Sequence, residues 1–592
     1  MVSMKKQFCT LAMCLGFISI LGGNSVMASN MVKAQIKEDT TSILKNPAMG
    51  WALYIDTVGG RIDIGDYIPE AEFYWESVEN AVPYVSHLYL RVAWAELEPQ
   101  KGRYAWIYDS NFKKLIQGAR DRGIKLCFSI YYLSKDAAVQ ATPDYVRQAG
   151  AEGHELYNLG GPGVKAWSPY EYDPVFQNAF SIFLTEFAKA FDNPDIVDYI
   201  DGVNLGWWGE THWMEKSGDK DTDSNALYTK AQKQQMYDWA VNLYSSKIKH
   251  VLLLDHASDF GFDFTYREKA LAKNYQMRRC SVGSKWFWPQ EKEFVRQNWP
   301  KYAFFAENAF HHFYEKWWNN TDAGINGYTI PEMMQAVYDD ALASRANSLE
   351  LRIPVDVDMW LSERPDLVQS FAIKCGYRLS PTDVSYPSSV KAGQSFSVTH
   401  SWKNEGVGKL PNNNSAWNGK YKIAFALLDK ATGKPVSVGV QSGYELGTLI
   451  KENPAVGLSA GISAPSLPGS YYFAVGIVDT QKSNRPDIKL ALKNENKNGW
   501  YVLGDIKVAG PAITTASSAA SVSSGSETLS SKTQTQSAED GSGSNSRIDS
   551  AQVEGGGTVW SAPLLIAGAG AVLISLEAVG IWYFKKRKKE RN

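Results

Sequence analysis

The fold of this chain is indicated first by residues 86–132, SHLYLRVAWAELEPQKGRYAWIYDSNFKKLIQGARDRGIKLCFSIYY. Apolar, β-branched and aromatic residues fill the two ends of this stretch, 86–94 and 124–132, and a longer helical stretch separates them. Two strands joined in this way form a β-α-β unit, in which the strands lie parallel. The stretch therefore predicts a parallel sheet covered by helices.

The same alternation of short strands and longer helices runs from about residue 46 to 375. Eight parallel strands with helices between them are typical of a (β/α)8 TIM barrel, which belongs to the α/β class. We therefore predict a barrel domain over residues 29–378. The eight expected strands are 48–55, 86–94, 124–132, 198–206, 250–257, 280–287, 302–307 and 348–354.

From residue 379 to 509 the pattern changes to alternating strands separated by turn residues, as in QSFSVTHSW at 394–402 and SYYFAVGIVD at 470–479. This pattern predicts an all-β sandwich domain. Trp402, Trp417 and Tyr421 could form a glycan-binding face or belong to the core, and their spacing does not separate the two. We expect a spacer or a packing partner of the barrel.

The two ends of the chain indicate export and anchoring. Residues 1–28 have two lysines, an apolar run and a small-residue cleavage site, which together predict a signal peptide. Residues 510–557 are rich in Ser, Thr and Gly and predict a disordered stalk. Residues 560–584 form an apolar run long enough to span a bilayer, and the basic tail 585–592 follows it. We therefore expect the plasma membrane to hold the chain at the cell surface, with the tail in the cytoplasm.

This layout resembles that of Gram-positive surface proteins. The chain has no LPxTG motif before the apolar run, so a plain membrane anchor is expected rather than sortase attachment.

The cysteines beyond the signal are Cys127, Cys280 and Cys375, and an odd number without a CxxC spacing argues against a disulfide framework and against a zinc site. The formal net charge of −2 and the absence of a basic stripe indicate no nucleic-acid partner.

Two glutamates lie at the carboxyl ends of strands of the expected barrel, Glu210 just after the fourth strand and Glu307 as the last residue of the seventh. Glu210 lies in DGVNLGWWGETHW, residues 201–213, and Glu307 lies in YAFFAENAF, residues 302–310. Catalytic residues of such barrels lie at the carboxyl ends of the strands, so these two side chains are expected at one mouth. Two carboxyl groups at one mouth are what glycosidic bond cleavage requires. The sequence therefore predicts a glycoside hydrolase that acts on an oligo- or polysaccharide.

Three tryptophans surround Glu210, namely Trp207, Trp208 and Trp213. We expect them to exclude water, to raise the pKa of Glu210 so that it holds a proton near neutrality, and to stack against sugar rings. No cofactor and no metal are expected for this chemistry. The pair His311 and His312 lacks carboxylates at ligand spacing and is a weak indication of a metal.

The placing of Glu210 at the fourth strand and Glu307 at the seventh resembles clan A of the glycoside hydrolases, the 4/7 barrels. The segment LRVAWAELEPQKGRYAW, residues 90–106, also resembles the second strand of β-galactosidase-like barrels. The resemblance implies that Glu210 is the general acid/base, that Glu307 is the nucleophile and that Arg91 steadies it. It further implies that the reaction retains the anomeric configuration.

One position departs from the clan A pattern. Gly209 stands directly before Glu210, where the clan usually has an asparagine that contacts the sugar 2-hydroxyl, and the nearest asparagine is Asn204. Each expected sugar contact could instead have a purely structural role. Arg91 could form a structural salt bridge, His256 could be a structural histidine, and the tryptophans could pack in the ordinary way. The substrate-binding candidates are Arg91, Trp94, Asn204, Trp207, Trp208, Trp213, His256, Trp286 and Trp288.

Other carboxylates compete with these two. Asp201 precedes the expected mouth, Glu215 lies beyond the tryptophans, Asp356 could contact substrate, and Glu98 is expected to shape its loop. Two functions without catalysis stay open, a glycan-binding protein on a glycosidase-like barrel and an adhesin that acts through its sandwich. The sugar and its linkage are expected to depend on the long loops at 133–180 and 208–230.

Overall fold

The computed structural model describes residues 30–57, 68–133, 140–157, 165–212, 214, 228–249, 251–254, 260, 262–308, 328–414 and 417–510. All of these belong to the first of two compact units of the chain, Met1–Thr514. The predicted signal peptide, stalk, apolar span and basic tail lie outside the described residues. None of the helices within the described ranges is long and apolar enough to cross a membrane.

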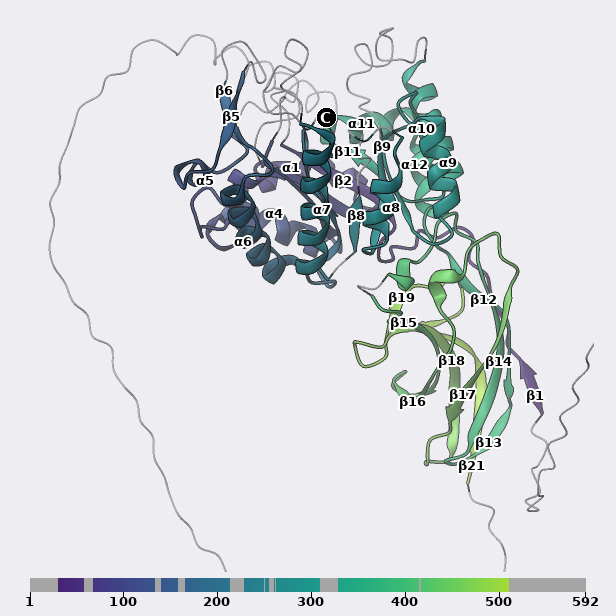
Figure 1. Cartoon of the computed structure of the whole chain (residues 1–592). Coiled ribbons are helices and arrows are strands. Elements are labelled where there is room, and N and C mark those ends of the chain that lie inside the picture. Colours follow the sequence, from purple (N-terminus) through teal and green to yellow (C-terminus); the bar gives the residue numbers. More distant parts are fainter. Residues whose placement is uncertain are drawn as a thin grey trace, which may run out of the picture. The chain divides into compact units, whose positions relative to one another are not determined.

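Eight parallel strands close into a barrel, as the sequence predicted (Figure 1). They follow one another around the barrel in chain order, and the last strand pairs with the first. The sixth strand starts five residues before its predicted position at 280. The prediction missed these first residues because Gln276 and Arg278 are polar, although the strand is buried. The strands are β2 (Gly50–Asp56), β3 (Val85–Ala93), β4 (Lys125–Tyr131), β7 (Val197–Gly202), β8 (Leu252–Leu254), β9 (Tyr275–Val282), β10 (Phe304–Asn308) and β11 (Ala346–Arg352).

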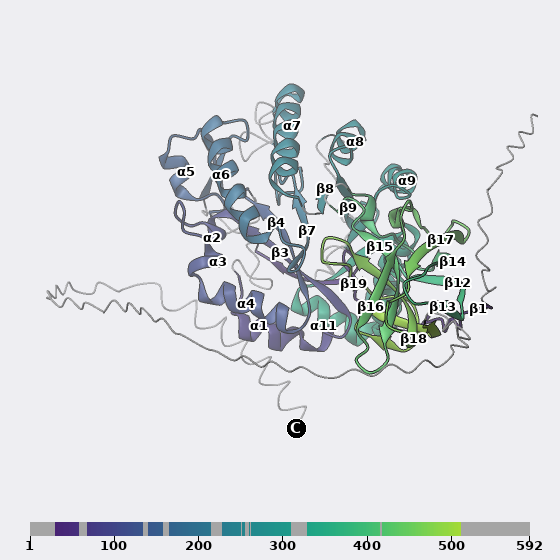
Figure 2. The ribbon, with the colours of Figure 1, turned by 90° about the horizontal axis from the view of Figure 1, so that it is seen from below.

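Helices connect successive strands and surround the barrel, as Figure 2 shows for α4, α6, α7, α8 and α9. This arrangement confirms the (β/α)8 prediction. The helices between β2 and β9 are α1 (Ala71–Val78), α2 (Trp94–Leu97), α3 (Ala105–Tyr108), α4 (Ser110–Asp121), α5 (Asp144–Gln148), α6 (Pro174–Phe191), α7 (Lys230–Lys247) and α8 (Thr265–Leu271). Those that follow β9 are α9 (Pro289–Asn298), α10 (Ile330–Ala343), α11 (Pro354–Glu363) and α12 (Pro365–Lys374).

Helix α6 illustrates why these segments pack as they do. The carboxylate of Asp173 accepts a hydrogen bond from the backbone N–H of Phe176 at 2.8 Å and caps the helix, and a proline occupies its first turn. Phenylalanines then recur every three or four residues and form one buried stripe. Phe187 of this stripe packs edge-on against Phe128 of β4, with ring centroids 5.1 Å apart.

A hairpin extends the connection between β4 and β7. Its strands, β5 (Gly153–Tyr157) and β6 (Lys165–Pro169), pair antiparallel. The hairpin lies within the long loop at 133–180, which the sequence identified as a place where substrate choice could be encoded.

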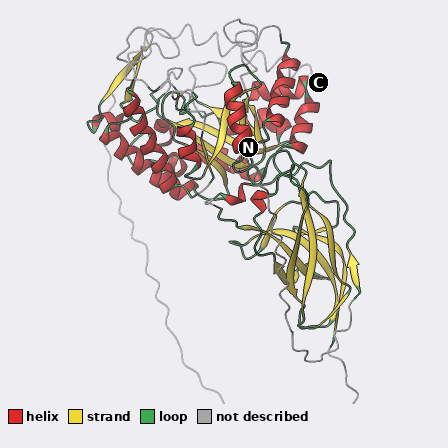
Figure 3. Ribbon diagram, turned by 45° about the vertical axis from the view of Figure 1, so that its right-hand side comes forward, coloured by secondary structure: helices red, strands yellow, loops and turns green. Residues whose placement is uncertain are grey.

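The regular secondary structure of the second part of the described chain consists mainly of strands, which loops connect (Figure 3). One sheet has the order β1-β12-β14-β17, and the other follows β13-β21-β18-β15-β16, with β19 and β20 paired at its side. The first sheet contains β1 (Met31–Lys33), β12 (Leu379–Pro387), β14 (Ser395–Asn404) and β17 (Val456–Ser463). The second contains β13 (Ser389–Lys391), β15 (Tyr421–Asp429), β16 (Pro435–Val440), β18 (Gly469–Asp479), β19 (Arg485–Ile488), β20 (Asn496–Lys497) and β21 (Trp500–Ala509).

The β domain therefore includes a strand from the other end of the chain, since β1 pairs antiparallel with β12. Its interior is aromatic: Tyr386 stacks on Phe473 with centroids 4.0 Å apart. Trp402, Trp417 and Tyr421 are at most 2% exposed, so these three belong to the core and offer no glycan-binding face. Asn347 of β11 receives a hydrogen bond from the backbone N–H of Lys409 at 3.0 Å, which joins the sandwich to the amino end of a barrel strand.

Candidate active site

The interior of the barrel has an aromatic floor below its mouth. Successive side chains of a strand point to opposite faces, so alternate residues of each barrel strand enter the interior. Tyr54 of β2 and Tyr89 of β3 meet edge-on with ring centroids 4.7 Å apart, and Tyr199 of β7 lies 4.9 Å from Phe305 of β10. Burial raises the pKa of Tyr54 and of Tyr89 well above the ordinary tyrosine value. Their hydroxyl groups therefore stay neutral beneath the site.

Arginines from three strands lie on this floor. Arg91 follows Tyr89 by two positions on β3, while Arg278 and Arg352 come from β9 and β11. The guanidinium of Arg278 lies 4.8 Å from the ring centroid of Tyr89, and that of Arg352 lies 4.5 Å from that of Tyr54. All three are at most 4% exposed. The term "arginine cluster" is used below for these three arginines together with the carboxyl groups in contact with them.

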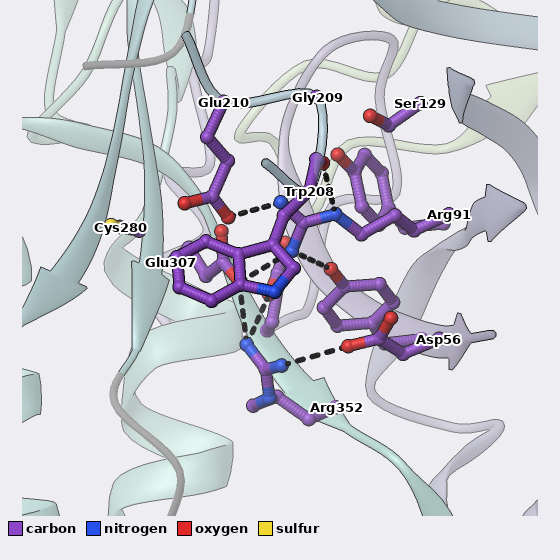
Figure 4. Close-up of polar contacts among 12 residues, drawn as sticks. Asp56, Arg91, Ser129, Trp208, Gly209, Glu210, Cys280, Glu307 and Arg352 are labelled. Atoms are coloured by element: carbon purple, nitrogen blue, oxygen red, sulfur yellow. Dashed lines mark hydrogen bonds and ion pairs between the residues drawn. The ribbon is translucent and has the colours of Figure 1, made fainter. Parts of the chain in front are cut away.

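Glu210 and Glu307 lie on either side of Arg91, as the sequence predicted for one mouth. One terminal nitrogen of Arg91 donates to the Glu210 carboxylate, and the other lies 4.0 Å from Glu307. Arg91 also donates to the hydroxyl of Tyr54 at 2.9 Å and to the backbone carbonyl of Trp208 at 3.0 Å. Figure 4 shows this continuous series of contacts from Glu210 through Arg91 and Glu307 to Arg352.

Among the arginines of the described residues, two that the sequence did not identify lie closer to Glu307 than Arg91 does. Arg352 donates to one carboxylate oxygen of Glu307 at 2.6 Å, and Arg278 lies 2.7 Å from the other. The contact with Glu307 that was expected of Arg91 is thus made mainly by Arg278 and Arg352. Arg91 instead pairs with Glu210, and a guanidinium in direct contact with a carboxyl group favours its ionised form. The predicted effect of the tryptophans on Glu210 is therefore opposed by a cation.

Further carboxyl groups surround the same arginines. Glu350 lies 2.9 Å from Arg278 and 3.5 Å from Arg352. Asp201 lies 3.5 Å from Arg278, and Asp56 lies 3.6 Å from Arg352. Among the described residues of the arginine cluster, carboxyl groups outnumber guanidinium groups. Burial and the neighbouring Glu307 raise the pKa of Glu350 to about 8.

The backbone around Glu210 has an unusual conformation. Val203, Asn204, Trp208 and Thr211 all have positive φ, at 76°, 50°, 60° and 54°. Positive φ is uncommon for residues other than glycine and is a genuine outlier for a β-branched residue such as Val203. Strained backbone of this kind persists where the surroundings determine it, and it concentrates at functional sites.

Hydrogen bonds hold this strained segment in place. The backbone N–H of Trp208 donates to the Leu133 carbonyl at 3.1 Å, and that of Thr211 donates to the Leu205 carbonyl at 2.6 Å. The Asn204 side-chain amide donates to Ser129 at 3.0 Å and reaches the Gly209 carbonyl at 3.4 Å. Asn204 is fully buried. It supports the segment that carries Glu210, and its burial does not favour the predicted contact with substrate.

Gly206→Ala is expected to unfold more easily and to lose activity. Gly206 has a φ of 67°, and a Cβ there would lie 2.3 Å from the backbone carbonyl oxygen of His212. The left-handed conformation alone costs an alanine about 1–2 kcal/mol, and relief of the collision must move the Glu210 segment. Denaturant unfolding and hydrolysis rates measure both effects.

Gly123→Ala is the matched control for this variant. Gly123 has nearly the same φ, 66°, but its Cβ would meet nothing within 4 Å, and it lies outside the mouth. It should lose only the conformational cost of about 1–2 kcal/mol and keep its activity. Equal losses in the two variants would contradict the collision argument.

No protein-family model matches this sequence, and no curated relative matches it significantly. Several solved structures are similar in fold. A GH30 endoxylanase from Clostridium papyrosolvens C71 is 12% identical, with a TM-score of 0.31 over 74% of this chain and 100% of that one. The exo-β-1,4-mannosidase Op5Man5 from Opitutaceae bacterium strain TAV5 is 11% identical, with a TM-score of 0.34 over 56% and 61%.

A D-psicose 3-epimerase from Clostridium cellulolyticum H10 is similar to about the same degree, at 12% identity and a TM-score of 0.28 over 55% of this chain and 96% of that one. Proteins with different activities thus resemble this chain at a similar level. The barrel itself is established by the closed order of its strands, and the chemistry has to be argued from the residues at its mouth.

The tryptophans that were predicted to contact sugar differ in how much of their side chain is exposed. Trp208 is half-buried and stacks against His212 with ring centroids 5.3 Å apart, so part of its indole is accessible to a sugar. Trp207 is only 3% exposed, and its ring meets that of Trp208 edge-on at 5.8 Å. Trp286 is half-buried beyond β9, whereas Trp288 is 43% exposed at the start of α9. Trp208, Trp286 and Trp288 therefore remain candidates for sugar platforms.

The buried position of Trp94 does not favour the predicted contact with substrate. It is fully buried at the start of α2, where its indole N–H donates to Glu98 at 3.0 Å. Its ring lies 5.2 Å from that of Phe180 on α6. Glu98 also accepts hydrogen bonds from the backbone N–H of Gly102 and the hydroxyl of Tyr145, each at 2.8 Å. This confirms that Glu98 shapes the loop after β3.

The rival carboxylates that lie in the described part are buried within the barrel. Asp201 is 3% exposed and accepts a hydrogen bond from the Tyr89 hydroxyl. Asp356 is fully buried in α11, 3.9 Å from Arg352, so the suggestion that it contacts substrate is not supported. Five predicted residues lie outside the described residues, namely Trp213, Glu215, His256, His311 and His312.

Arg278, Glu350 and Arg352 are the main residues that sequence reasoning missed. A usable signal existed, since Glu350 and Arg352 are charges two positions apart inside the strand ANSLELR, which places both on one face. The same signal applies to Arg278 in YQMRRCSV. No disulfide bond joins the three cysteines in the described chain, Cys127, Cys280 and Cys375, to one another, and no group of three potential metal ligands occurs within the described ranges.

Proposed function

We propose that this chain is a glycoside hydrolase that cleaves an oligo- or polysaccharide with two carboxyl groups and without a cofactor. The observation that carries the proposal is the meeting of Glu210, from the end of β7, and Glu307, from β10, at the two terminal nitrogens of Arg91. Glycosidic bond cleavage needs such a pair beside one anomeric carbon. The partly accessible indole of Trp208 adjoins the pair and offers a flat apolar surface for a sugar ring.

In this proposal Glu307 is the nucleophile. Contacts with Arg278 and Arg352 favour its ionised form, which is the form that attacks the anomeric carbon. The reaction then passes through a covalent glycosyl-enzyme and retains the anomeric configuration. The floor of buried tyrosines excludes water from below the reacting atoms and strengthens these ionic interactions.

Glu210 is the general acid/base. To protonate the leaving oxygen it must carry a proton, and its contact with Arg91 favours the ionised form. We propose that a bound sugar displaces the Glu210 carboxyl from Arg91, after which the surrounding tryptophans favour its protonated form. Arg91 keeps its contacts with Tyr54 and the Trp208 carbonyl during this change.

A second candidate function is glycan binding without catalysis. Two observations favour it: Glu210 forms a buried ion pair with Arg91, and Gly209 replaces the asparagine of the clan A pattern. In this alternative Arg91 and Glu210 form a fixed structural pair, and the aromatic mouth binds a sugar that is never cleaved.

Hydrolysis of a panel of aryl glycosides tests the proposal, with Glu210→Gln as the informative variant. Loss of a general acid lowers kcat/KM, which reports the formation of the glycosyl-enzyme, about a hundred- to ten-thousandfold for a poor leaving group that needs a proton. A dinitrophenolate leaving group needs none, so its release should fall far less. Turnover of one glycoside with this leaving-group dependence supports the enzyme.

The binding alternative predicts a different result. If no glycoside is turned over while a sugar of the panel still binds, as measured by calorimetry, the chain is a glycan-binding protein. A kcat/KM that Glu210→Gln lowers equally for both leaving groups would contradict the acid/base role of Glu210.

We also propose that the chain acts outside the cell and is held at the plasma membrane. The support is in the sequence alone, from the signal-like residues 1–28, the apolar run 560–584 and the basic residues that follow it. An exported position matches a polymeric substrate that cannot enter a cell.

A further inference from the structure

Glu350 and Glu307 compete for the same two arginines. Arg278 lies 2.7 Å from Glu307 and 2.9 Å from Glu350, while Arg352 lies 2.6 Å from Glu307 and 3.5 Å from Glu350. Both glutamates are 2% exposed, so water screens neither. Two ionised carboxylates this close in a buried site repel each other strongly.

The arginines cannot fully neutralise both glutamates, because each has other partners. Arg278 also contacts Asp201 of β7, and Arg352 also contacts Asp56 of β2 and Asp356 of α11. One carboxyl group of the Glu307 and Glu350 pair is therefore expected to bind a proton. Glu307 has the shorter contacts and a third arginine, Arg91, at 4.0 Å, so the proton is better placed on Glu350.

We propose that Glu350 is a positioning residue that holds a proton at neutral pH and thereby leaves Arg278 and Arg352 to bind an ionised Glu307. This inference rests on the proposed function, because it assigns Glu350 a part in preparing the nucleophile. When Glu350 loses its proton at higher pH, it draws the two guanidinium groups away from Glu307. The titratable and charged groups around it are Arg278 on β9, Glu307 on β10, Arg352 on β11, Tyr199 and Asp201 on β7, and Asp56 on β2.

The direction in which the pKa of Glu350 shifts agrees with placing the proton on Glu350. Burial and Glu307 raise the pKa of Glu350 from 4.5 to about 8 in the folded chain. Between these pH values the folded state binds a proton that the unfolded state has released, so this group makes folding less favourable as the pH rises from about 4.5 to about 8. Above that range the cost is constant.

Glu350→Gln, studied in the full chain, replaces the protonated carboxyl by a group of the same shape that cannot ionise. The melting temperature of the variant minus that of the wild type should rise from pH 5 to pH 8 and then level off. Glu98→Gln is the matched control, because Glu98 is equally buried at 1% exposed but lies outside the arginine cluster. The control difference should show no such rise.

A second measurement tests the role in the reaction. If ionisation of Glu350 limits activity, the ratio of variant to wild-type kcat/KM should rise about tenfold from pH 6 to pH 9, because activity falls about tenfold for each pH unit above a controlling pKa. A residue with only a structural role would change the rate without changing its pH profile. A flat ratio overturns the positioning role.

The outcomes separate this inference from the proposed function. A melting-temperature difference that stays flat between pH 5 and pH 8 overturns the placement of the proton, whatever the activity. A rising difference in a chain that hydrolyses no glycoside supports the placement and contradicts the proposed function. If Glu350→Gln fails to fold, infrared spectroscopy of the wild type gives the same answer, since a protonated-carboxyl band must disappear near pH 8; its absence at pH 7 overturns the inference.

Discussion

Glu307→Gln is expected to lower kcat by about ten-thousandfold or more while leaving the barrel folded. The amide cannot attack the anomeric carbon, so no covalent intermediate forms. Its oxygen can still accept the hydrogen bond from Arg352, which limits the structural damage. The measurement is kcat for the glycoside that the wild type hydrolyses. Mass spectrometry after reaction with a 2-fluoro glycoside shows whether the wild type gains a covalent adduct that the variant lacks.

Asp201→Asn is the matched control for the nucleophile. Asp201 is also a buried carboxylate beside Arg278, but it lies within β7 and accepts a hydrogen bond from Tyr89. It should lose much less activity than Glu307→Gln and should still form the adduct. An adduct on Asp201, or an equal loss of activity in both variants, would refute the assignment of Glu307.

Glu307→Gln also has a consequence for Glu350. The variant removes the negative charge that helps to raise the pKa of Glu350, and it leaves Arg278 and Arg352 to this one glutamate. Glu350 should then ionise at neutral pH. The stability cost between pH 5 and pH 8 should therefore become smaller in Glu307→Gln than in the wild type.

Arg91→Met is expected to destabilise the fold by about 3–5 kcal/mol, because it leaves a buried carboxylate without its cation. Glu210 is 6% exposed and Arg91 is 3% exposed, so water cannot replace the lost partner. The variant also removes the donor to the Trp208 carbonyl, which fixes the strained segment that carries Glu210. Denaturant unfolding measures the first effect, and hydrolysis or sugar binding measures the second.

Arg267→Met gives the matched control, since Arg267 is 7% exposed and lies 2.7 Å from Glu291 in the helical layer. It should lose stability to a similar extent but keep its affinity for sugar. If Arg91→Met were as stable as the wild type, the Arg91 and Glu210 contact would contribute little to folding. If it lost stability but bound sugar normally, Arg91 would have no part in arranging the mouth.

The barrel was predictable from the sequence because its signal is local. Each strand is a short run of apolar and β-branched residues, and each helix has an apolar stripe, such as the phenylalanines of α6. The sixth strand was misplaced for a local reason too, since Arg278 and Arg279 make YQMRRCSV look unlike a buried strand. These arginines are buried because other strands supply their partners, which a local pattern cannot show.

The sequence by itself determined the architecture and the position of Glu210 and Glu307 after their strands, because chain order fixes which strand ends meet at the mouth of a parallel barrel. Only the tertiary structure decided the partners of these glutamates. Arg91 was expected beside Glu307 but pairs with Glu210, and Trp94 and Asn204 are buried supports. Ionic contacts depend on distances of a few ångströms between side chains from strands far apart in sequence, and no local pattern records those distances.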